Sequence, residues 1–194
     1  MEEVGQHVLK LALEEGFIPD DTIAIDATHF EARDQAPAKQ GKIKEAPKKR
    51  GRKAKHEREA WLLQQQLEEE QKSIFDKKIA DLLPESYEKL RQQMPIAPEW
   101  GIKCNSEGKN FYWYRYKGHL AVGTQSQYIL GALLSSGNMN DGKAAIALLK
   151  GIKAQFLQYA FNYATMDAGY DYEPIYEEIR KTKADAIIAY NPKA

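Results

Sequence analysis

The stretch "IAIDATHFEARD", residues 23–34, alternates apolar and polar side chains as a half-buried β-strand does, and it places Asp26 near its centre. A carboxylate in such a strand is costly unless a hydrogen-bond donor or a cation accompanies it. Asp26 is therefore either held by hydrogen bonds or holds a cation itself. The rest of the chain has to decide between these two interpretations.

The chain has 194 residues, which suffices for one domain, or for one domain with an insertion, and excludes a large multidomain enzyme. Basic and acidic residues balance at 28 each, so the net charge says nothing about partners. The charge distribution is uneven. Residues 1–34 hold nine acidic and two basic side chains, whereas residues 39–58 hold ten basic and two acidic ones.

The single cysteine, Cys104, excludes an internal disulfide, and no apolar run approaches the roughly 18 residues of a membrane span. The N-terminal stretch "MEEVGQHVLKLALEEG" lacks the basic start and apolar centre of a signal peptide. We therefore expect a protein of the reducing cytoplasm. Four histidines and one cysteine without ligand spacing argue against a zinc site.

The hydrophobic pattern predicts alternating strands and helices on both sides of residues 35–104. Those residues combine a proline- and lysine-rich run with strong helix formers and offer little to bury, so we expect an insertion there. The predicted elements are, in order, a helix before Gly16, a strand at 22–32, strands at 111–123 and 125–137, a helix at 138–158, a strand from 163 to about 167, a helix at 172–183 and a strand at 184–191.

This order predicts an α/β domain with a mixed sheet. The first three strands are expected to pair antiparallel, and the last two to be parallel after helical crossovers. Residues 1–34 and 105–194 would form the core, and residues 35–104 a lysine-rich and helical insertion.

Asp26 and Asp167 meet at one edge of the core if their strands are neighbours, because Asp167 ends the strand that begins at residue 163. Two carboxylates held close repel each other unless one is protonated or a divalent cation neutralises them. Oxygen ligands suit Mg²⁺ or Mn²⁺, as in phosphodiester chemistry. The alternative is structural, with Asp26 capping a turn and Asp167 capping the helix near Tyr172.

Four short motifs, in order, resemble the catalytic domain of DDE transposases of bacterial insertion sequences. They are "IAIDATHFEARD", "YKGHLAVG", "NMNDG" and "MDAGYD". The resemblance runs from about Ile23 to the end of the chain, apart from the lysine-rich insertion. It implies a ribonuclease H-like fold, in which Asp26 and Asp167 match the family's first two metal-binding aspartates, and an enzyme that nicks and rejoins DNA at transposon ends.

The family's third acidic residue is a glutamate further downstream, within a Tyr, Arg, Glu, Lys signature that we do not find in this sequence. Glu173, Glu177 and Glu178 follow Asp167 too soon to match it and are expected on the solvated face of a helix. We therefore expect a transposase chain truncated before its third carboxylate, with one sheet face partly uncovered as a result.

Other polar residues of these motifs have both functional and structural interpretations. His119 matches a histidine of the family's second strand and could orient an active-site carboxylate, or it could be an ordinary polar residue of the sheet. Asn138, Asn140 and Asp141 are candidate caps of the helix at 138–158, and an N-cap role accounts for Asp141 directly. Asp171 and His29 are candidates for supporting the metal ligands, although a structural role accounts for each.

The basic run "KKRGRKAK", residues 48–55, predicts contacts with DNA phosphates, and its "RGR" core could enter a minor groove. A solvated linker is the alternative. The residues expected to bind DNA are Lys48, Lys49, Arg50, Arg52, Lys53 and Lys55. The aromatic run "FYWYRYKG" could stack on a base, but alternating aromatics also pack sheets.

The first hypothesis is therefore a transposase fragment. In the complete enzyme, Asp26 and Asp167 would bind Mg²⁺ or Mn²⁺ for hydrolysis and strand transfer. Its partners would be the terminal inverted repeats, target DNA and further copies of the chain, at the bacterial nucleoid and without a membrane. A second hypothesis is a non-catalytic DNA-binding remnant that competes with an active transposase. A third is a self-contained nuclease that takes its third carboxylate from Glu173, Glu177 or Glu178.

Overall fold

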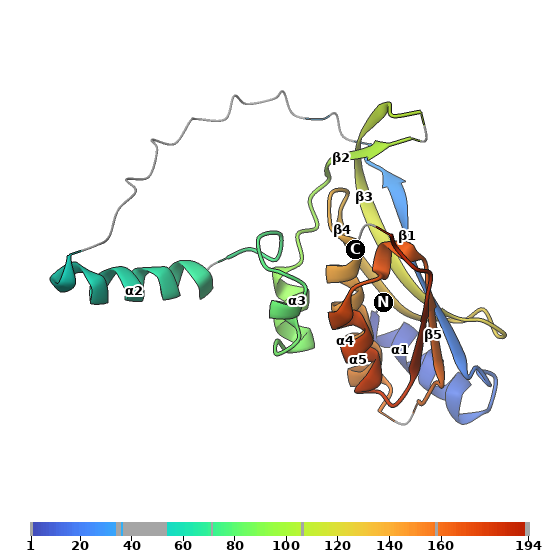
Figure 1. The fold of residues 1–194 in the computed structure, drawn as a ribbon. Coiled ribbons are helices and arrows are strands. Elements are labelled where there is room, and N and C mark those ends of the chain that lie inside the picture. The colour runs from blue at the N-terminus through green and yellow to red at the C-terminus, as the bar shows by residue number, and fades with distance from the viewer. Residues whose placement is uncertain are drawn as a thin grey trace.

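The computed structural model of the chain describes residues 2–33, 36, 54–70, 72–105, 107–157 and 159–192. At its centre lies a six-stranded mixed sheet (Figure 1). The strands are β1 (Thr22–Glu31), β2 (Glu99–Cys104), β3 (Asn110–Gly123), β4 (Ile129–Ser136), β5 (Tyr163–Met166) and β6 (Asp185–Ile188).

The strand order is β2-β3-β1-β5-β6, and β4 also pairs with β3. The long β3 pairs antiparallel with β1 on one side, and with β2 and then β4 along its length on the other. β5 is parallel to both β1 and β6. This arrangement confirms the predicted mixed sheet and is compatible with a ribonuclease H-like fold.

Five α-helices and two short 3₁₀-helices accompany the sheet within the described residues. The elements are α1 (Glu2–Glu14), α2 (Lys55–Glu70), α3 (Tyr87–Gln93), α4 (Asp141–Gln155), α5 (Glu173–Arg180), η1 (Ala80–Leu82) and η2 (Ala168–Tyr170). None of these helices has the length and apolar character needed to cross a membrane.

The central helix α4 forms because a capped start precedes a run of small and aliphatic side chains. The cap is Asn140, whose side chain accepts a hydrogen bond from the backbone N–H of Lys143 at 3.2 Å. Asn140 is one of the three caps that the sequence suggested, whereas the N-cap interpretation of Asp141 was wrong. Gly131 of β4 lets α4 lie close, because a Cβ there would be only 3.0 Å from side-chain atoms of Leu148 and Ile152.

The two faces of the sheet differ sharply in burial. The face under α4 carries Ile23 and Ala121, both fully buried. Alternation along the strands puts Asp26 on the opposite face, where apolar side chains such as Phe30 and Ile187 are about half exposed, at 48% and 54%. Within the described residues, this second face of the sheet is thus largely open.

Part of the predicted insertion packs into the main core. Ile74, Leu82, Leu90 and Met94 are buried in the same cluster as the residues of α4. Strand β2, which the sequence pattern did not predict, adds to the sheet edge by pairing with the first half of β3. Residues 72–94 therefore pack with α4 in the layer that covers the sheet, and β2 extends the sheet itself.

Candidate functional site

Asp26 and Asp167 lie level with each other on neighbouring strands. β1 and β5 run parallel, with Ala24 opposite Thr165. If this register is continued by two residues along each chain segment, Asp26 lies opposite Asp167. Adjacent strands are about 4.8 Å apart, and both side chains are exposed. The register thus places the two carboxylates on neighbouring parallel strands, Asp26 midway along β1 and Asp167 directly after the end of β5.

One oxygen of each carboxylate accepts a local backbone hydrogen bond. The N–H of Ala27 donates to Asp26 Oδ1 at 2.7 Å, and the N–H of Gly169 donates to Asp167 Oδ1 at 2.9 Å. Asp167 therefore caps η2, rather than the helix near Tyr172. Within the described ranges, the second oxygen of each aspartate accepts no hydrogen bond, so each keeps an oxygen for a ligand.

This pair of carboxylates fits part of a divalent-cation site. Mg²⁺ is commonly held by one or two carboxylates while it retains several waters, and two exposed aspartates can supply those ligands. Across the described residues, however, no three His, Cys, Asp or Glu side chains come together closely enough to hold a metal ion. The pair is thus a partial ligand set.

Tyr170 ends the 3₁₀-helix η2, which begins directly after Asp167. It is 2% exposed, and its hydroxyl has no hydrogen-bond partner among the described residues. Burial raises the pKa of Tyr170 well above its ordinary value, and the nearby carboxylates of Asp141, Asp26 and Asp167 raise it further. The hydroxyl is therefore a protonated group buried in the core beside α4.

His119 is buried under α4, on the face opposite Asp26. Its Nε2 is 2.8 Å from Ser135 Oγ, and its Nδ1 is 3.8 Å from Asp141 Oδ1, which is too long for a hydrogen bond. Burial lowers the pKa of His119 to about 4; Asp141 opposes this shift, while Lys117 and His29 add to it. His119 is thus a neutral residue of the interior that contacts the start of α4.

Lys117 joins the same group of side chains. Its Nζ donates to Asp141 Oδ1 and to the backbone oxygen of Met139, both at 2.9 Å, and its side chain is only 11% exposed. This buried contact ties the first residue of α4 to β3. Asp141 therefore serves as the partner of a buried lysine, in place of the N-cap role that the sequence suggested.

Asp171 fastens the segment that follows the pair. Its Oδ1 accepts a hydrogen bond from the hydroxyl of Tyr176 at 2.9 Å, and its Oδ2 accepts one from the N–H of Asn191 at 2.8 Å. These contacts connect the loop after η2 to α5 and to the chain beyond β6. Asp171 can support the position of Asp167 only through the backbone between them.

The glutamates of α5 are engaged with basic side chains. Glu173 contacts Arg180, Glu177 contacts Lys181, and Glu178, which is buried, contacts Lys181 at 3.2 Å and Lys150 at 3.7 Å. Glu178 therefore lies in the interior, where the sequence analysis expected a solvated face.

Most of the basic run at residues 48–55 lies outside the residues that the structure describes. Lys48, Lys49, Arg50, Arg52 and Lys53 lie outside the described residues, and Lys55 is the first residue of α2. Their predicted contact with DNA stays a prediction.

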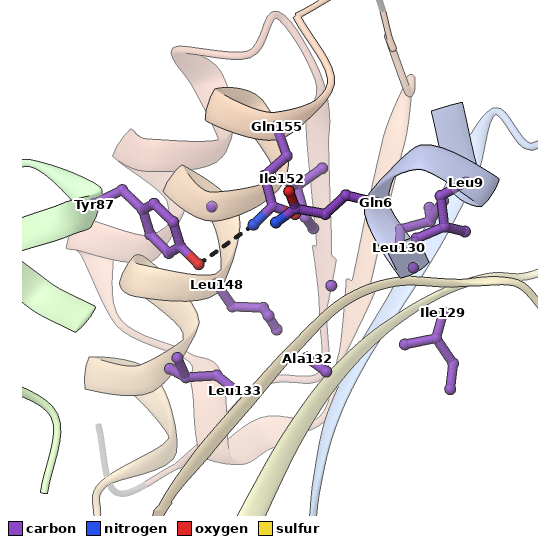
Figure 2. Close-up of a pocket in the computed structure, with 13 residues that line it drawn as sticks. Gln6, Leu9, Tyr87, Ile129, Leu130, Ala132, Leu133, Leu148, Ile152 and Gln155 are labelled. Carbon is purple, nitrogen blue, oxygen red and sulfur yellow. Dashed lines mark hydrogen bonds between the residues drawn. The ribbon is translucent and has the colours of Figure 1, made fainter. Parts of the chain in front are cut away.

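Two cavities among the described residues lie away from the aspartate pair. Figure 2 shows one of about 190 Å³ between α1, α3, α4 and β4, whose walls are mostly aliphatic and whose main polar contact joins Gln155 Nε2 to the Tyr87 hydroxyl at 3.4 Å. Another, of about 590 Å³, lies beside Asp20 and Tyr159. Neither includes Asp26 or Asp167, so the pair is a surface site.

The amino-acid sequence of the chain matches a known protein family. The family model described as the transposase DDE domain matches residues 18–194, which include both aspartates and every strand of the sheet. Searches of curated proteins and of solved structures found no match.

Proposed function

Because the chain belongs to the family of transposase DDE domains, we propose that it is catalytic machinery of a DNA transposase of a bacterial insertion sequence, built on a ribonuclease H-like sheet. The observation that carries the proposal is the shared register of β1 and β5, which aligns Asp26 with Asp167. Family membership makes DNA the expected substrate class.

Asp26 and Asp167 are proposed to hold Mg²⁺ or Mn²⁺ through the oxygens that accept no backbone hydrogen bond. When bound, a divalent cation would activate a water or a 3′-hydroxyl and stabilise the leaving oxygen. The backbone N–H groups of Ala27 and Gly169 orient the carboxylates by holding their other oxygens. Because the pair lies on an open sheet face, a DNA backbone can reach it.

The neighbouring residues are proposed to act on the site through the fold. Lys117 holds the start of α4 against β3, His119 joins β3 to Ser135 of β4, and Asp171 holds the loop after Asp167. The basic residues 48–55 would contact DNA phosphates in transposon ends or target DNA. Assembly of several copies on two transposon ends belongs to the same proposal.

A second candidate function is DNA binding without catalysis, in competition with an active transposase. The finding that favours it is the incomplete ligand set, since no third acidic residue joins the pair in the part of the chain that the structure describes. Both functions include DNA binding, and they differ in whether a phosphodiester bond is broken.

Incubation with supercoiled plasmid DNA separates the two functions. Catalysis predicts that the chain converts supercoiled DNA to the nicked form in Mg²⁺ or Mn²⁺ and not in EDTA, as seen on an agarose gel. Binding of DNA that weakens with salt, together with no nicking at any concentration of either metal, would contradict the catalytic proposal and leave the second function.

A further inference from the structure

The sheet face that carries Asp26 also carries a row of aromatic side chains. Residues that pair directly across two antiparallel strands share one face of the sheet, and Asp26 pairs with Leu120 of β3. Every second residue of β3 therefore lies on the face of Asp26. The aromatic residues of β3 on this face, with the aromatic residues that pair with them, are Tyr112, Tyr114 and Tyr116 of β3, Trp100 of β2 and Phe30 of β1. We call these side chains the aromatic strip.

The aromatic strip is accessible to a ligand. Phe30 is 48% exposed, Trp100 39% and Tyr112 59%, while Tyr114 and Tyr116 are half-buried. The first part of the strip lies on β2 and the first half of β3, which extend beyond α4 and α5 (Figure 1). A sheet face that meets only solvent usually carries polar side chains. Large aromatic rings in this position therefore indicate a binding surface.

The strip ends beside the aspartate pair. Between Phe30 and Asp26, the next residue on the same face of β1 is Thr28, and it pairs with Gly118. A Cβ on Gly118 would overlap the ring of Phe30, so this ring lies against the backbone of β3 at the level of Thr28. Successive residues on one face of a strand are about 7 Å apart. The ring is thus one such step from Asp26, a distance that the sugar and base of a nucleotide span when its phosphate lies at the pair.

The chemistry of the strip fits nucleic-acid bases. Phenylalanine, tryptophan and tyrosine side chains are uncharged near neutral pH, so the strip does not attract phosphates by charge. Rows of aromatic side chains bind unpaired bases by stacking, whatever the base, because every base has a π face. Bases in a duplex are stacked on their neighbours and do not offer these faces. The strip is therefore suited to a strand whose bases are unpaired.

We propose that the aromatic strip binds unpaired bases of the DNA strand whose backbone reaches Asp26 and Asp167. The inference rests on the proposed action of the pair on DNA, and it adds that this DNA is locally single-stranded beside the bond that is broken. The observation that carries it is the continuity of the strip with Asp26 on one face of the sheet. The strand would follow β3 toward the pair.

Phe111 provides a matched control. It belongs to the same strand as the tyrosines of the strip and is 57% exposed, but it pairs with Lys103 and so lies on the opposite face. Phe111→Leu removes an exposed ring without changing the strip. Phe30→Leu and Trp100→Leu each remove one ring of the strip, and Phe30→Tyr keeps a ring beside the pair.

The test is a titration of fluorescein-labelled oligothymidylate with the full chain in EDTA, followed by fluorescence anisotropy. Phe30→Leu and Trp100→Leu are each expected to bind about tenfold more weakly, whereas Phe30→Tyr and Phe111→Leu should bind as the unmodified chain does. The duplex of oligothymidylate with oligoadenylate should bind equally to the unmodified chain and to every variant. Thermal unfolding should give the same melting temperature for all of them within a few degrees.

Three outcomes would overturn the proposal. The first is full affinity of Phe30→Leu and Trp100→Leu for oligothymidylate, and the second is an equal loss of affinity for the duplex. The third is that these substitutions dissociate a dimer in analytical ultracentrifugation and leave DNA binding unchanged, which would assign the strip to a second copy of the chain.

The nicking assay distinguishes this failure from failure of the catalytic proposal. If Asp26→Asn abolishes nicking while Phe30→Leu keeps full affinity for oligothymidylate, the strip is refuted and the catalytic pair stands. If Asp26→Asn nicks DNA normally while Phe30→Leu binds oligothymidylate more weakly, the catalytic proposal fails and base binding by the strip is supported.

Discussion

Replacing Asp26 or Asp167 by asparagine is expected to reduce metal-dependent DNA nicking by about 10³-fold or more. The substitution keeps the size of the side chain and removes the negative charge that holds the cation. Because both carboxylates serve one cation site, the effects of the two substitutions should not add. The double variant should keep the same residual nicking activity as each single variant. Conversion of supercoiled plasmid to nicked circles measures the effect.

Asp185→Asn is the matched control for these variants. Asp185 is an exposed aspartate at the start of β6, the strand next to β5. Its replacement should leave nicking unchanged, and all four variants should keep the melting temperature of the unmodified chain within a few degrees. Undiminished nicking by Asp26→Asn would remove the pair from the mechanism.

Lowering the pH from 7 to 5 is expected to cost the fold about 2 kcal/mol through His119 alone. The pKa of this buried histidine is lowered to about 4, so the folded chain keeps it neutral at pH 5. The unfolded chain binds a proton there below about pH 6.5. Stability from this residue is therefore complete above that pH and is lost as the pH falls from 6.5 toward 4.

The measurement is urea unfolding at pH 7 and pH 5 for the unmodified chain and for His119→Gln. Glutamine can still contact Ser135 but does not titrate, so the variant should lose about 2 kcal/mol less than the unmodified chain between the two pH values. Other titrating groups contribute equally to both proteins and cancel. An identical pH dependence for the two would show that His119 is not held neutral by burial.

Local sequence patterns were sufficient for the central strands and for α4. The alternation in β1 and the capped aliphatic run of α4 each follow from short stretches whose burial is regular. Strand β2 escaped prediction because "EWGIKC" contains a glycine, follows two prolines closely and becomes a strand by pairing with β3. Residues 99–104 form a strand because they pair with β3, and the local sequence pattern does not specify that pairing.

The same limit applies to residues 72–94. Ile74, Leu82 and Leu90 lie in a stretch that Pro84 interrupts and that the sequence analysis assigned to an insertion, yet all three are completely buried. Their burial results from contact with α4 and the rest of the core, a tertiary effect that composition does not reveal. The composition of the predicted insertion therefore did not indicate that part of it packs into the main core.

For the candidate site, the sequence could propose residues but not their contacts. Asp26 was proposed from its place within a predicted strand and Asp167 from its place at a strand end, but only the register between β1 and β5 aligns them. The sequence pattern suggested an N-cap role for Asp141. Its hydrogen bond with Lys117 of β3 is a tertiary contact that only the structure shows.

The most direct test of the central claim is to locate bound Mn²⁺ by its broadening of backbone amide signals in the NMR spectrum of the chain. The account predicts that small amounts of Mn²⁺ first broaden the amides of Ala27 and Gly169, which donate to Asp26 and Asp167. The amides of Gln125 and Ser126, which donate to another aspartate, Asp20, should stay sharp. Broadening at Gln125 and Ser126 with sharp signals at Ala27 and Gly169 would contradict the claim.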